Sequence, residues 1–105
     1  MVEKINTEKF DELLKGETPV VCDFYADWCG PCKMLAPVIE KCSEKFTNAK
    51  FVKVNVDESF ELAARYGVMS IPMVGVFKGG ELADKSVGFT SQAETEEFLS
   101  GVLSV

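Results

Sequence analysis

The feature that most limits the possible folds is the run Pro19–Ala26, which reads PVVCDFYA. β-Branched and aromatic residues dominate this run, and polar and apolar side chains alternate little, which is the pattern of a central strand covered on both faces. A helical pattern follows closely, because apolar residues from Leu35 to Phe46 recur at steps of three and four. The sequence therefore predicts a buried strand, a short connection and a helix from Pro31 to about Phe46.

Two cysteines stand at this junction, where residues 28–32 read Trp-Cys-Gly-Pro-Cys. Thiols separated by two residues can close a small ring or attack in turn, and a helix start favours a thiolate placed there. Cys29 lies just before the helix and Cys32 lies inside its first turn. We therefore expect Cys29 to attack a disulfide and Cys32 to resolve the mixed disulfide. Gly30 allows a tight turn, and Pro31 stiffens the connection at the first helical positions.

Half of a zinc site is the alternative interpretation of this CxxC motif. The chain has no histidine and only four cysteines, and no second CxxC motif supplies the remaining ligands. We therefore expect no metal and no cofactor beyond the redox-active Cys29–Cys32 pair. Cys22 and Cys42 occupy apolar positions and are expected to be small core residues, with regulation through their oxidation as the alternative.

Asp23 is unusual because it places a carboxylate in the middle of the predicted central strand. Burial there would raise its pKa, and the carboxyl could carry a proton to or from Cys32. The alternative is a strand-end aspartate in solvent. Lys53 lies in an alternating strand on the face opposite the valines, so it could lie against Asp23 and stabilise its charged form. An ordinary solvated lysine at a sheet edge is the competing interpretation of Lys53.

The other segments alternate between strand and helix patterns. In chain order they are a strand at 2–5, a helix capped by Asn6 or Thr7, a strand at 51–56, a helix capped by Ser59 and ended by Gly67, strands at 73–78 and 81–87, and a helix at 91–103 with Phe98, Leu99 and Val102 buried. Gly79-Gly80 indicates an antiparallel hairpin. Pro37 predicts a kink near Lys33, unless the helix begins at Pro37 and leaves Cys32 in a loop.

Charge and composition exclude several classes of function. There are 17 acidic and 11 basic residues, a net charge of −6, and the basic residues are scattered, which argues against nucleic acid and against anionic membrane surfaces. The first residues lack a secretory signal pattern, and no apolar stretch is long enough to span a bilayer. A single soluble domain in the cytoplasm is expected from these features.

The segment Trp28–Lys33 closely resembles the thioredoxin family. The resemblance continues along the chain in order and spacing, at Val21–Tyr25, Pro37, Lys53–Asp57, Tyr66–Val68, Ile71-Pro72, Phe77-Lys78, Gly80 and Gly88. It implies an α/β thioredoxin fold, a five-stranded mixed sheet flanked by four helices, formed by residues 1–105 as one domain. It also implies a general protein-disulfide reductase and electron carrier.

The same resemblance implies roles for individual residues. Cys29 matches the nucleophile, Cys32 the resolving thiol, Asp23 the buried acid, Lys53 its neighbour and Pro72 a cis-proline facing the dithiol. An apolar patch for a partner's extended segment would comprise Trp28, Gly30, Pro31, Ile71, Pro72 and Gly88, with Ile71 offering backbone hydrogen bonds. The implied partners are a thioredoxin reductase and disulfide-containing client proteins, acting on a monomer.

Three residues depart from the family pattern. Tyr25 stands where tryptophan is frequent, Cys22 where an aliphatic residue is frequent, and Met73 where threonine usually follows the proline. Met73 is near the expected site, and our hypothesis is that it changes partner preference or the match to a reductase without altering the exchange chemistry. Two rival functions remain open from sequence, a redox-independent binding module and a related oxidase or isomerase. Gly-Pro between the cysteines resembles the reducing members.

Overall fold

The apolar run Pro19–Ala26 contains β2 (Val20–Tyr25), the middle strand of a five-stranded sheet with the order β1-β3-β2-β4-β5. The computed structural model describes all residues from 1 to 105. The other elements are β1 (Glu3–Lys4), α1 (Thr7–Leu14), α2 (Gly30–Lys45), β3 (Lys50–Asn55), α3 (Phe60–Arg65), β4 (Met73–Lys78), β5 (Glu81–Val87) and α4 (Gln92–Leu103). The prediction of a mixed sheet with four helices is confirmed.

The sheet is mixed because its two halves run differently. β1, β3 and β2 are parallel, whereas β4 is antiparallel to β2 and β5 is antiparallel to β4. The turn between β4 and β5 uses Gly79 and Gly80, whose φ angles of 61° and 82° are in the region that glycine adopts readily. The predicted antiparallel hairpin is therefore confirmed.

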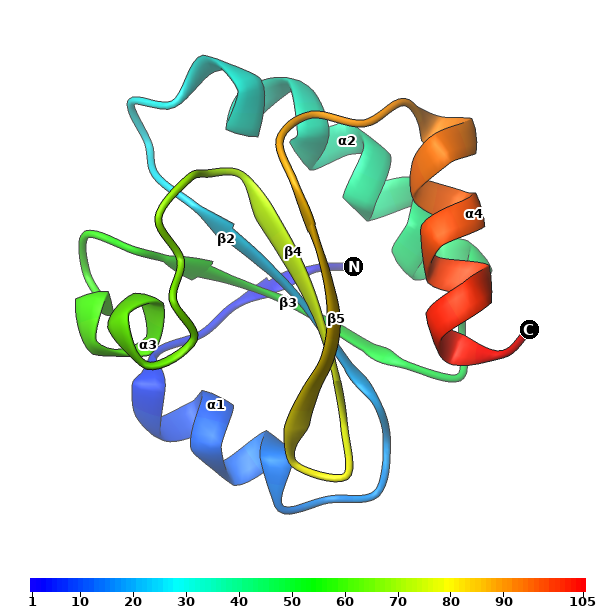
Figure 1. Cartoon of the computed structure of the whole chain (residues 1–105), viewed down its shortest axis with the longest axis horizontal. Helices are drawn as coiled ribbons and strands as arrows, with labels where there is room; N and C mark the ends of the chain where they lie inside the picture. The colour runs from blue at the N-terminus through cyan, green and yellow to red at the C-terminus, as the bar shows by residue number, and fades with distance from the viewer.

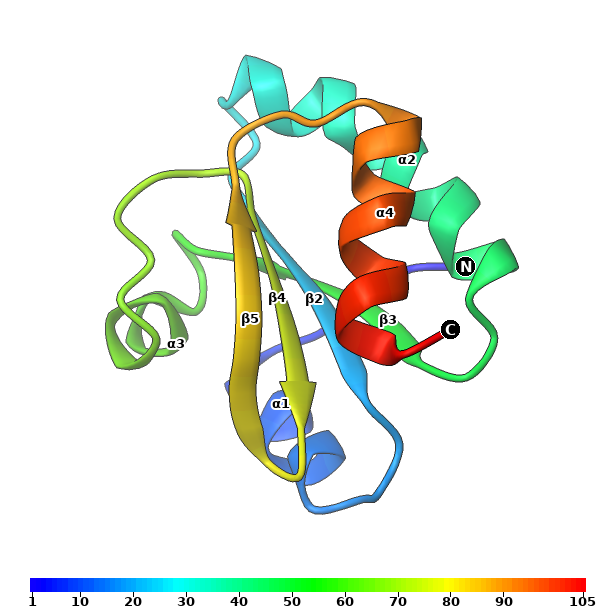
Figure 2. The same ribbon diagram turned by 45° about the vertical axis from the view of Figure 1, so that its right-hand side comes forward.

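Helices cover both faces of the sheet (Figures 1 and 2), with α1 and α3 on one face and α2 and α4 on the other. The side chains of β2 alternate between two apolar clusters, with Cys22 and Phe24 in the cluster that contains α1 and α3, and Val21 in the cluster that contains α2 and α4. A strand whose two faces are both buried reads as a nearly continuous apolar run, which is the pattern seen in the sequence.

Helix α2 begins immediately after Cys29 and contains Pro37 in its interior. The alternative in which the helix begins at Pro37 is wrong, because Cys32 already lies in the first turn. The Lys33 N–H donates to the Cys29 carbonyl oxygen at 3.2 Å, which completes that first turn. The kink near Lys33 stays a prediction.

The ends of the other helices are partly as expected. The Asn6 side chain accepts the Lys9 N–H and caps α1, as predicted. Ser59 stands at the start of α3 but makes no side-chain capping bond, so its predicted role is wrong. The Asn55 carboxamide oxygen instead accepts the N–H groups of Asp57 and Glu58, which orders the turn before α3.

The buried face of α4 differs slightly from the prediction. Leu99 is buried as expected, but Phe98 and Val102 are only half-buried, and Thr95 and Leu103 complete the buried side. Ser91 and Glu94 form a capping box at the helix start. None of the helices has the length and apolarity that crossing a membrane requires.

Candidate functional site

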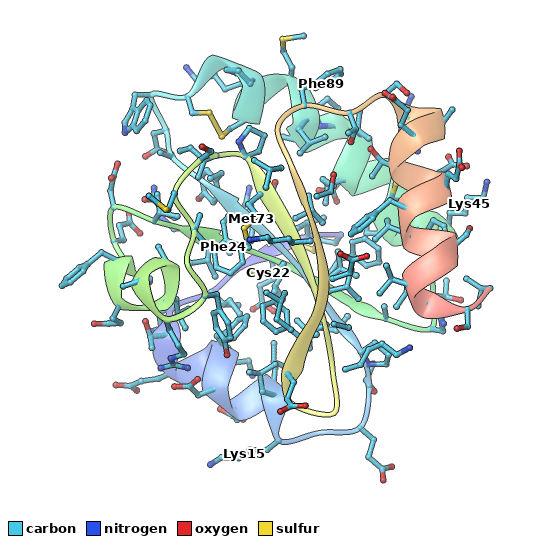
Figure 3. All side chains as sticks on the ribbon, in the orientation of Figure 1. Lys15, Cys22, Phe24, Lys45, Met73 and Phe89 are labelled. Atoms are coloured by element: carbon cyan, nitrogen blue, oxygen red, sulfur yellow. A yellow bond between two sulfur atoms is a disulfide. The ribbon has the colours of Figure 1, made fainter.

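The two cysteines lie where the chain leaves β2 and starts α2. Cys29 is the N-cap residue of α2, and its Sγ accepts the Cys32 N–H at 3.2 Å. The two residues form a disulfide with their Cα atoms 5.3 Å apart, drawn as a yellow bond in Figure 3. Free N–H groups and the dipole of a helix start stabilise negative charge, and here they are directed at Cys29. Cys29 is therefore the better placed of the two sulfurs to carry a thiolate.

The topology of the sheet places two further segments at the same end of the molecule. Met73, at the start of β4, is the register partner of Phe24 near the end of β2, and also of Val87 at the end of β5. Because β4 runs antiparallel to both neighbours, Ile71-Pro72 and Gly88 must lie beside the end of β2 that leads to the dithiol. The Gly88 N–H donates to the Pro72 carbonyl oxygen at 2.8 Å and links these two segments.

The Ile71-Pro72 peptide bond is cis, as the family resemblance implies. The carbonyl oxygen of Ile71 lies 3.9 Å from Cys29 Sγ, so this backbone faces the reactive sulfur. Neither the N–H nor the carbonyl of Ile71 has a backbone hydrogen-bond partner. Ile71 therefore offers a free donor and a free acceptor next to the disulfide.

The residues expected to form a docking patch differ in exposure. Trp28 is 71% exposed, Gly30 and Pro31 are exposed, Ile71 and Gly88 are half-buried, and Pro72 is buried. The Trp28 indole N–H donates to Asp57 Oδ2 at 2.9 Å, and this bond holds an exposed aromatic ring in one place. Sequence reasoning did not single out Asp57, because the two partners are 29 positions apart and no local pattern links them.

Asp23 is buried beneath the dithiol, with 4% of its surface exposed. One of its carboxylate oxygens, Oδ1, has no hydrogen-bond partner. Burial raises the pKa of Asp23 to about 7, and the positive charge of Lys53 opposes this rise without cancelling it. The prediction of a buried carboxylate with a raised pKa is confirmed, and the solvent-exposed alternative is wrong.

A hollow of about 150 Å³ connects this carboxylate with the second cysteine. Its walls come from β2, β3 and the first turns of α2, and they are formed by Asp23, Tyr25, Ala26, Asp27, Cys32, Lys33, Ala36 and Lys53. A hollow of this size, lined in part by charged side chains, has room for water, which can bridge groups that do not touch. The structure thus brings together Asp23, Lys53 and Cys32, as the sequence predicted.

Lys53 is the register partner of Asp23 across the parallel pair of β2 and β3, so the predicted neighbourhood is confirmed. Lys53 is half-buried in the middle of the sheet, which excludes the interpretation as a solvated edge lysine. No ion pair within 4.0 Å joins the two side chains. The Lys53 ammonium instead lies 5.6 Å from the centroid of the Tyr25 ring.

The remaining cysteines are free, and both are fully buried, as predicted. Burial raises the pKa of Cys22 and of Cys42. Met73, Cys22 and Phe24 lie together between the sheet and α1 and α3 (Figure 3), and Met73 is only 1% exposed. The Met73 side chain is therefore directed into the core, while its backbone borders the site.

No group of three or more histidine, cysteine, aspartate or glutamate side chains is arranged to hold a metal ion. The arrangement that does occur is a disulfide at a helix start, a free backbone edge beside it and a buried acid behind it. This combination can exchange electron pairs with other disulfides, because a dithiol at a helix start can attack and then close its ring.

Comparisons with known proteins agree with this chemistry. A family model described as thioredoxin matches residues 1–101. The chain is 44% identical over 94 residues to a thioredoxin of Mycoplasmoides gallisepticum, covering 90% of this chain and 94% of that protein. It is 45% identical over 94 residues to a thioredoxin of Bacillus subtilis, covering 86% and 90% of the two chains. A Plasmodium falciparum thioredoxin structure superposes with a TM-score of 0.89 at 33% identity, covering 95% and 98%.

Proposed function

Because the chain belongs to the thioredoxin family, whose members are thiol–disulfide oxidoreductases, we propose that Cys29 is its attacking thiol and Cys32 its resolving thiol. The observation that carries this assignment is that Cys29 Sγ caps α2 and accepts the Cys32 N–H. The position favours a thiolate on Cys29 and keeps Cys32 within reach of it. The function is reduction of protein disulfides by this pair.

In the first step the Cys29 thiolate attacks one sulfur of a client disulfide. A bond forms between Cys29 Sγ and that sulfur, the client S–S bond breaks, and the second client sulfur leaves as a thiolate. The product is a mixed disulfide between Cys29 and the client. No electrons have yet been transferred in net terms, since one disulfide has replaced another.

In the second step Cys32 resolves the mixed disulfide. Asp23 accepts the Cys32 thiol proton through the hollow that both residues line. The Cys32 thiolate then attacks Cys29 Sγ, and the first client sulfur leaves as a thiolate. Two electrons have passed to the client, and a Cys29–Cys32 disulfide remains. A pKa of about 7 suits Asp23 to this transfer, because the carboxyl is close to half-protonated near neutral pH.

The client docks as an extended segment on the patch formed by Trp28, Gly30, Pro31, Ile71, Pro72 and Gly88. The free N–H and carbonyl of Ile71 support this docking mode, because an extended segment needs main-chain partners. The Trp28 ring, fixed by Asp57, supplies exposed apolar area beside the disulfide.

Residues 1–105 act as one domain and as a monomer in the cytoplasm, where the protein serves electron transport and redox homeostasis. A thioredoxin reductase returns the Cys29–Cys32 disulfide to the dithiol. No metal, other cofactor, nucleic acid or membrane takes part. The net charge of −6 and the self-sufficient exchange chemistry support this part of the proposal.

A trapping experiment tests the proposed roles. Cys32→Ser should accumulate mixed disulfides with client proteins through Cys29, because the resolving thiol is missing. The matched control is Cys29→Ser with Cys32 intact, which should trap at least about tenfold less, since the helix-start thiolate is gone. Equal trapping by the two variants, or none by either, would contradict the assignment and favour a redox-independent binding module.

The direction of electron flow needs a separate measurement. The purified pair is equilibrated with glutathione buffers of known potential, and the fraction of disulfide is read by alkylation. A reductase should stay oxidised in buffers that reduce an oxidase or isomerase. A potential more oxidising than that of glutathione would instead identify an oxidase or isomerase.

A further inference from the structure

Tyr25 forms one wall of the hollow that joins Asp23 to Cys32. It lies two positions after Asp23 on β2, so both side chains are on the same face of the sheet. Their register partners on β3 are Asn55 and Lys53, which therefore share that face. Tyr25, Asp23 and Lys53 thus lie together on one face of the sheet and line the hollow that Cys32 also lines.

Lys53 has two possible partners in this region, and it contacts only one of them. Its ammonium lies over the Tyr25 ring, 5.6 Å from the centroid, within the range of a cation–π interaction. It makes no ion pair with Asp23, although the two residues are register partners. The free Asp23 oxygen, Oδ1, confirms that no donor reaches it from Lys53.

We propose that Tyr25 is a positioning residue, whose ring holds the Lys53 ammonium beside the hollow and away from direct contact with the Asp23 carboxylate. A direct ion pair would favour the charged form of Asp23 strongly, and the carboxyl would then hold a proton poorly at neutral pH. With the ammonium on the ring, the carboxyl keeps its capacity to take and return a proton. This inference rests on the proposed role of Asp23 in the resolution step.

Other charged groups around Asp23 do not replace Lys53. Asp27, from the connection after β2, and Lys33, from α2, line the same hollow and are both exposed. Lys4 of β1 pairs with Glu58 at 2.8 Å, and neither residue lines the hollow. No charged residue of β4 faces Asp23, whose register partner there is Val74. Lys53 is therefore the cation whose position decides how strongly Asp23 is ionised.

The experiment compares two variants of Tyr25 by NMR titration of the Asp23 carboxyl carbon. Tyr25→Leu removes the ring, frees Lys53 to pair with Asp23, and should lower the Asp23 pKa by about one unit. Tyr25→Phe keeps the ring face and should leave the titration within about 0.3 units of the wild type. The pH profile of mixed-disulfide resolution should shift in the same direction in Tyr25→Leu.

A second pair of variants tests whether the effect passes through Lys53. In a Lys53→Met background, Tyr25→Leu should no longer lower the Asp23 pKa, since the mobile cation is absent. An equal fall with and without Lys53, or no fall in Tyr25→Leu, would overturn the proposal. These titrations do not depend on client trapping by Cys29, so this inference and the proposed reductase mechanism can fail independently.

A measurement on the wild type keeps the proposal testable if Tyr25→Leu does not fold. The Lys53 side-chain methylene protons next to the ammonium should show an upfield ring-current shift that Tyr25→Phe preserves. Unshifted resonances would overturn the proposal, because they would show that Lys53 does not rest on the ring.

Discussion

The two faces of strand β2 place titratable groups that are buried to a similar extent in different environments. On the face toward α1 and α3, Cys22 and Phe24 are fully buried in an apolar cluster. On the opposite face, Asp23 is almost as buried but adjoins a hollow that Lys53 and Cys32 also line. Burial alone therefore does not decide whether a titratable group is inert. The contact with a hollow and with a neighbouring charge decides it.

The same contrast separates the cysteines. Cys22 has a raised pKa because burial disfavours its thiolate, and no helix start or cation compensates. Cys29 has nearly the same low exposure, 4%, but it caps a helix and lies beside the exposed Trp28.

The first prediction concerns thiol alkylation in the fully reduced protein at pH 7. Cys22 becomes accessible only when the central strand opens, which costs at least about 5 kcal/mol, so it should react at least about 10³-fold more slowly than Cys29. Mass spectrometry of iodoacetamide-quenched samples measures both rates. In denaturant the difference should disappear, and a ratio below tenfold in the folded protein would contradict the prediction.

The second prediction concerns the apolar face of β2. Phe24→Ala removes a fully buried ring whose centroid lies 6.5 Å from that of Phe77. The free energy of unfolding should fall by about 3–5 kcal/mol, as expected for a large cavity in a packed core. Urea denaturation of the oxidised protein gives the value. The exposed Phe60→Ala on α3 is the control, and a loss as large there would show that the method does not report core packing.

The third prediction concerns the opposite face and its dependence on pH. The pKa of Asp23 is about 7 in the folded protein against 3.8 for the free group, so the folded state binds more protons between these values. Stability should therefore fall as the pH rises from about 4 to about 7, by about 2–4 kcal/mol at about 1.4 kcal/mol per pKa unit. Asp23→Asn should abolish this fall, whereas the exposed Asp27→Asn should retain it. Urea midpoints at pH 5 and pH 8 measure both, and equal curves for wild type and Asp23→Asn would refute the assignment.

The fourth prediction concerns Trp28 and has the smallest expected effect. Asp57→Ala removes the acceptor of the indole N–H, a partly exposed hydrogen bond worth about 0.5–1.5 kcal/mol. If Trp28 docks the client as we propose, the value of kcat/KM for a disulfide client should fall by less than about tenfold, because only the placement of its ring is lost. Trp28 is the single tryptophan, so its fluorescence reports the same change. Asp84→Ala on β5 removes the same charge and should change neither measurement.

Local patterns in the sequence predicted the elements that are periodic or carry a motif. The continuous apolar run of β2, the stripe of α2 and the glycine pair of the hairpin each depend on neighbours within a few positions. The place of Cys29 before the start of α2, from which we propose the order of attack, was also readable from the sequence. The burial of Asp23 was equally predictable, because apolar residues stand on both sides of it in a central strand.

Contacts between distant segments could not be predicted in the same way. The Trp28 indole N–H reaches Asp57 only because the pairing of β2 with β3 places the connection after β2 beside the turn after β3. Ser59 stands at the cap position of α3 without a side-chain capping bond, whereas Asn55 accepts the N–H groups of Asp57 and Glu58 in the turn before it. Propensity alone does not say which polar residue near a helix start uses its side chain in this way. The Lys53 ammonium lies over the Tyr25 ring and not against the Asp23 carboxylate. This depends on side-chain conformations, which the sequence pattern does not predict.

The cap of α2 couples the redox state of Cys29 to the hydrogen bonding of the Cys32 amide. Helices are normally capped by serine, threonine, asparagine or aspartate, whose side chains stay chemically unchanged. Here the acceptor is Cys29 Sγ, the atom that in the proposed mechanism bonds first to a client sulfur and then to Cys32. Each cycle of exchange therefore also changes the capping atom of α2, the longest helix. The hydrogen-exchange rate of the Cys32 amide should accordingly report whether Cys29 is a thiolate, is in a mixed disulfide or is bonded to Cys32.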